Sequence, residues 1–220
     1  SEFSWKKRTK YHIFLGKNGH NAILFKRKNG QNSCNYMIDR CLDGLIKNHY
    51  ENSRNALLLS GARQVGKSYA IRKYGKANYS CFVEINFIEQ PEAIRIFQNA
   101  TSSSDLLLRL STFVQQTLVK GETLIFFDEV QAYPDVLTWI KFLVDSAEYK
   151  YALSGSLLGV QLNDIHSIPV GYLSEMEVFP LSFEEFVRAV GVGDITINSL
   201  RESWNNHTPV DMLVHQKMMQ

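Results

Sequence analysis

Short apolar runs alternate with amphipathic stretches along most of this chain, and the alternation predicts an α/β fold. Five runs rich in aliphatic and aromatic residues have the length of buried strands, at residues 56–59, 80–87, 123–129, 151–156 and 175–179. Apolar residues recur at the spacing of one helical face in residues 68–74, 91–98, 104–120, 133–148 and 182–190. Strands that alternate with helices indicate a parallel sheet covered by helices.

The chain before this pattern is different. Residues 1–36 show no helical period and carry several Gly and Asn residues. A helix is expected to begin near Met37, because one helical face would then carry the apolar residues Ile38, Cys41, Leu42, Leu45 and Ile46. We therefore place the start of the main domain at Met37.

The pattern is also interrupted near the other end. Gly191 and Gly193 break the chain after the helix at 182–190, which opens with a predicted capping box. Residues 200–204 and 210–219 are helical again, and apolar positions continue to the last residue. We expect the main domain to cover 37–191, and 192–220 to be the truncated start of a helical C-terminal domain.

The charge distribution separates the N-terminal arm from the rest. The 220 residues are 45 % hydrophobic and 21 % charged, which is ordinary for a globular protein, with a net charge of +2. Residues 1–36 hold eight basic residues and one acidic residue, a net +7, whereas the other 16 basic and 21 acidic residues give −5. The arm is either a basic segment for nucleic acid or a leader left by cloning, which Ser1-Glu2-Phe3 resembles.

Cysteine usage and hydropathy indicate the cellular compartment of the protein. Cys34, Cys41 and Cys81 lack the spacing of metal ligands and leave one cysteine over from any pairing, which favours a reducing cytoplasm. No apolar run approaches the ~20 residues that span a bilayer, and residues 11–15 are too short and polar for a signal peptide. We expect a cytoplasmic protein without a membrane partner.

Residues 61–68 fit the phosphate-binding pattern G-x-x-x-x-G-K-[ST] at every fixed position. Gly61 and Gly66 permit backbone angles that turn successive N–H groups toward phosphate oxygens. Lys67 can reach the β- and γ-phosphates, and the Ser68 hydroxyl can complete the shell of a Mg²⁺ ion. The alternative is a glycine-rich turn before a core helix. The predicted nucleotide-binding residues are Gly61, Ala62, Arg63, Gln64, Val65, Gly66, Lys67, Ser68 and Tyr69.

Two further predicted strands end in residues that could take part in ATP hydrolysis. The apolar run from Thr123 stops at Asp128 and Glu129, as a buried parallel strand does on reaching a site at its carboxyl end. Asp128 is placed to hold Mg²⁺, and Glu129 to polarise the water that attacks the γ-phosphate. Without the phosphate loop, an acidic pair after an apolar strand would more often be a solvated turn. Ser154 ends the next strand, where its hydroxyl either senses the γ-phosphate or belongs to an ordinary turn.

These segments together resemble a known family. Residues 61–68, Phe126-Phe127-Asp128-Glu129-Val130-Gln131, Leu153-Ser154-Gly155-Ser156 and the stretch 172–186 are similar to a large group of bacterial and archaeal AAA-type ATPases with a C-terminal domain of unknown function. The resemblance implies a P-loop NTPase fold, a three-layer α/β/α arrangement with a parallel five-stranded sheet in the order 5-1-4-3-2. It also implies that Asp128 and Glu129 are the Walker B pair and that Ser154 stands at the sensor position.

The chain departs from that family in two respects. Many members carry Ala-Gly-Arg after the Ser-Gly-Ser strand, whereas this chain has Ser167-Ile168-Pro169-Val170-Gly171, so no arginine finger is assigned. Members are also roughly twice as long. The segment 1–36 lies outside the resemblance.

The sequence therefore predicts a Mg²⁺-dependent ATP-binding protein that hydrolyses ATP slowly and acts as a conformational switch. The expected catalytic residues are Glu129, Lys67 and Ser154, and the expected metal ligands are Ser68 and Asp128. Two alternatives remain: an ATPase that uses the basic arm on nucleic acid, and a non-hydrolysing nucleotide-binding scaffold for a protein partner. A protein partner is expected to bind through the missing C-terminal half. ATP rather than GTP follows from the family resemblance and from the lack of an Asn-Lys-x-Asp motif.

Overall fold

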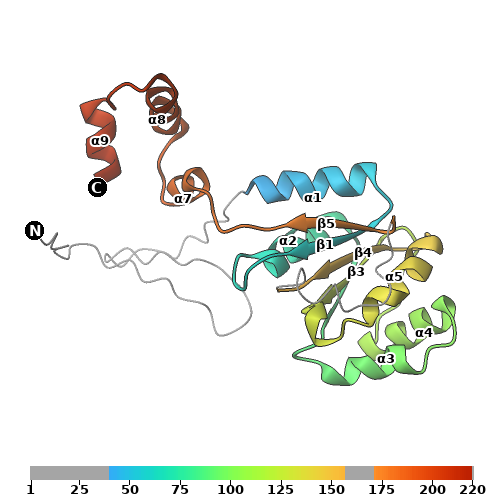
Figure 1. The fold of residues 1–220 in the computed structure, drawn as a ribbon. Coiled ribbons are helices and arrows are strands. Elements are labelled where there is room, and N and C mark those ends of the chain that lie inside the picture. Colours follow the sequence, from blue (N-terminus) through green and yellow to red (C-terminus); the bar gives the residue numbers. More distant parts are fainter. Residues whose placement is uncertain (1–39, 157–170, 220) are drawn as a thin grey trace, which may run out of the picture. The chain divides into compact units, whose positions relative to one another are not determined.

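The computed structural model describes residues 40–156 and 171–219 (Figure 1). The basic arm and residues 167–170 of the segment that replaces the family's arginine motif lie outside the described residues. The chain divides into two compact units, one formed by Cys41–Pro180 and one that contains Arg40 and the residues from Leu181 onward. The predicted boundary at residue 191 lies ten residues after this division, and it stays a prediction.

The first unit is built on a five-stranded parallel sheet whose strand order is β2-β3-β4-β1-β5. This order is the predicted 5-1-4-3-2 counted from the other edge, so the predicted fold is confirmed. The five strands are β1 (Ala56–Ser60), β2 (Cys81–Asn86), β3 (Thr123–Asp128), β4 (Lys150–Ser154) and β5 (Leu173–Glu177).

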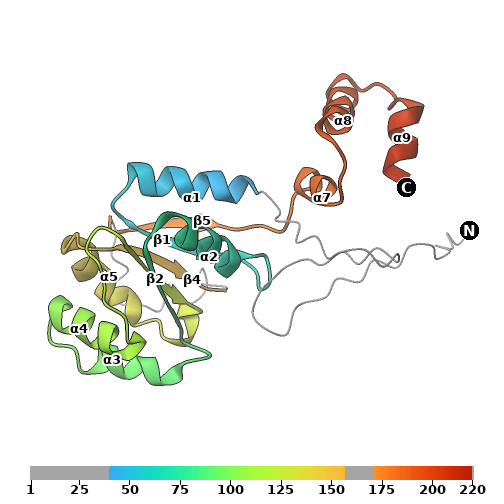
Figure 2. The ribbon, with the colours of Figure 1, turned by 180° about the vertical axis from the view of Figure 1, so that it is seen from behind.

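Helices cover both faces of the sheet and produce the three predicted layers (Figures 1 and 2). One cluster of buried residues joins the sheet to α1 (Cys41–Asn52) and α2 (Lys67–Asn78). The other cluster joins the opposite face to α3 (Ile94–Gln98), α4 (Ser103–Val114) and α5 (Val136–Asp145). Two short 3₁₀ turns complete the unit, η1 (Pro91–Ala93) and η2 (Val130–Ala132).

The central strands are buried on both faces because successive side chains point to opposite sides of the sheet. Leu57 and Leu59 pack toward α1 and α2, whereas Leu58 packs toward α3, α4 and α5, and all three are fully buried. This packing explains why β1 and β3 read as continuous apolar runs rather than as an alternating pattern.

Some sequence-predicted boundaries and core positions are wrong. Helix α4 ends at Val114 instead of Lys120, because Gln115 adopts a left-handed backbone conformation with a φ of 53° that closes the last turn. Leu45 is 51 % exposed and Cys41 is exposed, although both were expected on the buried face of α1. His49 and Tyr50 are the buried residues in the last turns of that helix.

Among its described residues, the second unit contains the helices α7 (Phe183–Ala189), α8 (Asp194–Asn206) and α9 (Met212–Met219). The predicted capping box is present, since Ser182 accepts a hydrogen bond from the Glu185 backbone and the Glu185 side chain accepts one in return. Helix α8 begins six residues before the predicted start at Leu200. In the described part of the chain, no helix has both the length and the apolar character needed to cross a membrane.

Candidate nucleotide-binding site

The polar ends of the parallel strands meet at one edge of the sheet. In the pairing of β2 with β3, Asn86 lies opposite Asp128, and in the pairing of β1 with β4, Leu59 lies opposite Ser154. The carboxyl ends of parallel strands are where open α/β folds bind ligands. The sheet therefore places the phosphate loop, the acidic pair and the serine strand end together.

The backbone of the loop after β1 has the conformation that the motif requires. Gly61 has a φ of 135° and Gly66 a φ of 94°. A residue with a Cβ would adopt either backbone angle only at an energetic cost. A Cβ on Gly61 would lie 2.3 Å from the carbonyl oxygen of Val178, which follows β5. Gln64 also adopts a positive φ of 64° without being glycine. The loop is thus a tight turn packed against a neighbouring strand.

Lys67 opens α2 and reaches back into the loop. Its ammonium group donates to the carbonyl oxygens of Gly61 at 3.0 Å and Ala62 at 2.6 Å. Burial lowers the pKa of Lys67, while the charges of Glu129 and Asp128 act in the opposite direction. The loop therefore holds a positive charge beside the start of a helix, where the helix dipole also favours an anion.

The first carboxylate oxygen of Asp128 is the common acceptor of the site. Asp128 is 2 % exposed, and its Oδ1 accepts from the Ser68 hydroxyl at 2.8 Å, from the Ser154 hydroxyl and from the Glu129 backbone N–H at 3.1 Å. These donors come from α2, from the end of β4 and from the residue after β3. One buried carboxylate thus joins three segments that lie far apart in the sequence.

The second oxygen of Asp128 is held more loosely. Its Oδ2 accepts from the Asn86 side-chain amide at 3.3 Å and lies 3.5 Å from Nη2 of Arg72. Arg72 makes much closer contacts with Glu84 on β2, and the hydrogen bonds with Glu84 are the main reason that the pKa of Arg72 is raised.

The residues present fit a Mg²⁺ ion. Ser68 Oγ and the Asp128 carboxylate are already in contact, and both are hard oxygen donors of the kind that Mg²⁺ prefers. Mg²⁺ in phosphate-transferring sites uses one or two carboxylates and keeps the rest of its shell for water and phosphate oxygens. The predicted metal ligands are therefore adjacent, as their role requires.

Glu129 lies immediately beyond the strand in an unusual conformation. It has a φ of 57° and a ψ of 45°, a left-handed geometry that is sparsely populated by residues other than Gly, Asn and Asp. Its carboxylate accepts from the Gln131 side-chain amide, whose oxygen accepts from the Ser156 backbone N–H at 3.1 Å. Glu129 is half-buried and connected through Gln131 to the segment that follows β4.

The remaining predicted nucleotide-binding residues have different environments. Ala62, Arg63 and Gln64 are exposed at the tip of the loop, whereas Val65 packs against the cluster under α1 and α2. Tyr69 is half-buried next to Ser68. The predicted sensor residue Ser154 is 1 % exposed, and its hydroxyl contacts Asp128.

Sequence reasoning missed three residues of this network, namely Asn86, Arg72 and Gln131. A signal existed for Asn86, because it interrupts an apolar strand at the position where that strand reaches the edge. Arg72 stands four residues after Ser68 and therefore on the same face of α2. Gln131 carried no local signal beyond its place in the segment shared with the AAA-type family.

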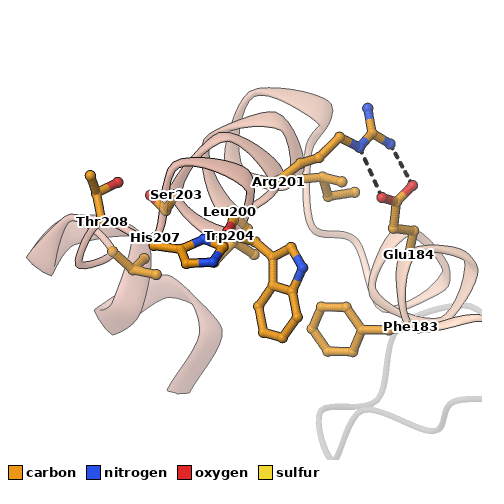
Figure 3. Close-up of a pocket in the computed structure, with 10 residues that line it drawn as sticks. Phe183, Glu184, Leu200, Arg201, Ser203, Trp204, His207 and Thr208 are labelled. Atoms are coloured by element: carbon orange, nitrogen blue, oxygen red, sulfur yellow. Dashed lines mark hydrogen bonds and ion pairs between the residues drawn. The ribbon is translucent and has the colours of Figure 1, made fainter.

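A second hollow lies within the helical unit and contains no residue of the phosphate loop. It encloses about 600 Å³ and is lined by the rings of Phe183 and Trp204 and by Leu200, with the ion pair between Arg201 and Glu184 beside them (Figure 3). Arg201 Nη2 lies 2.6 Å from a Glu184 carboxylate oxygen.

A comparison with protein families agrees with this geometry. A family model described as "AAA domain" matches residues 53–187, which is more than half of the chain. The comparison with curated proteins gave no match. Solved structures with a similar fold include PCH-2 of C. elegans (12 % identity, TM-score 0.40, 74 % of this chain and 45 % of that one). Another is a variant of RuvB from Thermotoga maritima (12 % identity, TM-score 0.39, 68 % and 48 %).

The chain spans about half the length of these two structures. The family match covers the phosphate loop, the acidic strand end and the serine strand end. The chain therefore belongs to the AAA domain family.

Proposed function

We propose that this chain binds ATP with Mg²⁺ and hydrolyses it slowly, using the cycle as a conformational switch. The observation that carries the proposal is the contact between Ser68 and Asp128, beside a phosphate loop that already holds the Lys67 ammonium. A loop motif alone binds phosphate, whereas the adjacent pair of oxygen ligands adds a metal position next to it.

Each residue has a distinct task in the proposed reaction. The Lys67 ammonium, now on two loop carbonyls, binds β- and γ-phosphate oxygens. Ser68 and Asp128 hold Mg²⁺, which when bound neutralises charge on the phosphate oxygens. Ser154 keeps the Asp128 carboxylate oriented through its hydroxyl.

Glu129 is the proposed general base. Its carboxylate orients the attacking water and accepts its proton at an Oε atom, while the bond from water oxygen to the γ-phosphorus forms and the bond to the β–γ bridging oxygen breaks. Gln131 donates to the same carboxylate and fixes its direction. This arrangement supports ATP hydrolysis, and the proposed rate of hydrolysis is slow.

The proposed switch rests on how the strand ends are connected. Asp128 links α2, β2 and β4, and Gln131 links the residue after β3 to the segment after β4. A change in negative charge at the loop would alter the balance of these hydrogen bonds together, because they share two carboxylates. The proposed protein partner would respond to that rearrangement.

The test compares the parent chain with Lys67→Ala and Glu129→Gln. Binding of a fluorescent ATP analogue is measured with Mg²⁺, and phosphate release is measured at saturating ATP. Lys67→Ala is expected to lose binding. Glu129→Gln is expected to keep binding and to release phosphate about 100-fold or more slowly, the effect of losing a general base. Equal binding by the parent and Lys67→Ala would contradict the proposal.

A further inference from the structure

An ion pair that is not part of the phosphate loop stands beside the proposed metal ligand. Arg72 on α2 donates from Nε to both carboxylate oxygens of Glu84, at 2.8 and 2.9 Å, and its Nη2 lies 2.5 Å from Glu84 Oε1. The same Nη2 is 3.5 Å from Oδ2 of Asp128. The guanidinium therefore contacts two carboxylates, and Glu84 has the shorter contacts.

The sheet explains why these three groups meet. Glu84 and Asn86 are two residues apart on β2 and so project from the same face, and Asn86 is paired with Asp128 on the neighbouring strand β3. Glu84 is thus the diagonal neighbour of Asp128 across the strand pair. Arg72 comes from the helix that packs over this face and can reach either carboxylate.

The two possible pairings of Arg72 differ in their surroundings. The side chains of Arg72 and Glu84 are 23 % and 24 % exposed, whereas that of Asp128 is 2 % exposed. An opposite charge acts more strongly on a carboxylate that is shielded from water. A full ion pair with Arg72 would therefore affect Asp128 more than the present pair affects Glu84.

A guanidinium and Mg²⁺ are competitors for a carboxylate, because both are cations that use its oxygen lone pairs. The Oδ1 atom of Asp128 already accepts from two hydroxyls and a backbone N–H. Close hydrogen bonds from Arg72 to the remaining oxygen would leave little capacity for a metal ion. The structure avoids this arrangement, because Arg72 lies closer to Glu84 than to Asp128.

We propose that Glu84 is a positioning residue that restrains Arg72, so that Asp128 keeps its capacity to hold Mg²⁺. This inference rests on the proposed function, in which Asp128 is a metal ligand. Glu84 acts through Arg72 and does not itself touch nucleotide or metal. Its loss releases Arg72 to pair with Asp128, and that pair weakens metal-dependent binding.

The experiment measures the affinity for a fluorescent ATP analogue with Mg²⁺ and with EDTA in the parent, Glu84→Gln and the double variant Glu84→Gln, Arg72→Gln. Glu84→Gln keeps the side-chain shape and removes the charge that holds Arg72. We expect it to weaken Mg²⁺-dependent binding about tenfold, the scale of an Arg beside an Asp carboxylate, and to leave binding in EDTA unchanged. The double variant is expected to recover most of that loss, because the competing cation is gone.

The single variant Arg72→Gln supplies a second measurement if Glu84→Gln does not fold. It removes the cation near Asp128 and is expected to bind the Mg²⁺ complex at least as tightly as the parent. Equal Mg²⁺-dependent affinity in the parent and Glu84→Gln would overturn the inference. So would a loss in Glu84→Gln that persists in the double variant and appears equally in EDTA, since this would show a structural role alone.

The outcome for the parent separates the two proposals. A parent that binds in a Mg²⁺-dependent way while Glu84→Gln behaves identically would overturn only the role of Glu84. A parent without Mg²⁺-dependent binding would overturn the proposed function and this inference together. Circular dichroism and the thermal unfolding midpoint of each variant show that the comparison is made between folded chains.

Discussion

The carboxyl edge of the sheet and the helices α7 to α9 place polar and apolar side chains in opposite ways. At the sheet edge, the polar residues Asp128 and Ser154 are buried to 2 % and 1 % exposure and bonded to each other. In the helical unit, the apolar residues Phe183, Trp204 and Ile195 are 64 %, 82 % and 89 % exposed. The first region is organised by buried hydrogen bonds, and the second exposes its apolar surface.

This difference indicates which interactions stabilise each region. Buried polar groups at the sheet edge are costly unless every one has a partner, so their geometry is tightly constrained by the surrounding core. The helical unit depends instead on its capping box and on exposed ion pairs such as that between Arg201 and Glu184. Exposed ion pairs contribute little to stability, because water screens their attraction and the side chains lose freedom. Substitutions in the two regions should therefore differ in effect.

The largest difference is expected between two aromatic residues. Phe127 is fully buried among Phe87, Phe97 and other core residues, so Phe127→Ala is expected to cost about 4 kcal/mol of unfolding free energy. Trp204→Ala removes a larger side chain that is 82 % exposed, and its cost is expected to stay below about 1 kcal/mol. Urea unfolding followed by circular dichroism measures both. Similar costs would show that the apolar surface of the helical unit is covered in solution.

A smaller difference is expected between two glycines that both have a positive φ. Gly61→Ala combines a positive φ with a Cβ placed 2.3 Å from a backbone oxygen, and we expect it to cost about 3 kcal/mol. Gly191→Ala, at a φ of 93° in the helical unit, meets nothing within 4 Å and should cost only the backbone term of about 1 kcal/mol. Urea unfolding and hydrogen exchange in α2 and α7 test this pair. Equal costs would mean that the loop after β1 can move away from Val178.

The smallest expected effect concerns pH and His49 in the sheet unit. His49 is 9 % exposed, its Nε2 lies 3.0 Å from the Asn55 carbonyl oxygen, and burial lowers its pKa below the ordinary 6.5. The folded state therefore binds this proton less readily than the unfolded state. Its contribution to stability is complete above about pH 6.5 and declines as the pH falls below that value.

The corresponding measurement is the thermal unfolding midpoint of the parent and His49→Gln at about pH 7.5 and about pH 5. The parent is expected to lose more stability on acidification than the variant, because only the parent must protonate a buried imidazole. An identical drop in both chains would show that other groups dominate the acid response.

The sequence predicted most of the first unit because its signals are local. The apolar runs and the glycines at 61 and 66 each express a rule that acts within a few residues, as does the capping box at Ser182 in the second unit. The end of α4 was missed, since the left-handed residue that closes it is Gln115 rather than Gly. Leu45 was wrongly predicted to be buried, because helical periodicity identifies the apolar face of a helix but not how much of that face other elements cover.

The sequence by itself determined the order of strands and helices, the phosphate loop and the candidate acidic pair. Only the tertiary structure decided that Asn86 and Arg72 contact Asp128, that Glu84 contacts Arg72, and that Gln131 connects Glu129 to the segment after β4. The physical reason is that most of these contacts join distant residues, up to 56 positions apart for Arg72 and Asp128. Parallel strand pairing brings such residues to one edge, and no local pattern records which of them will be hydrogen-bonded there.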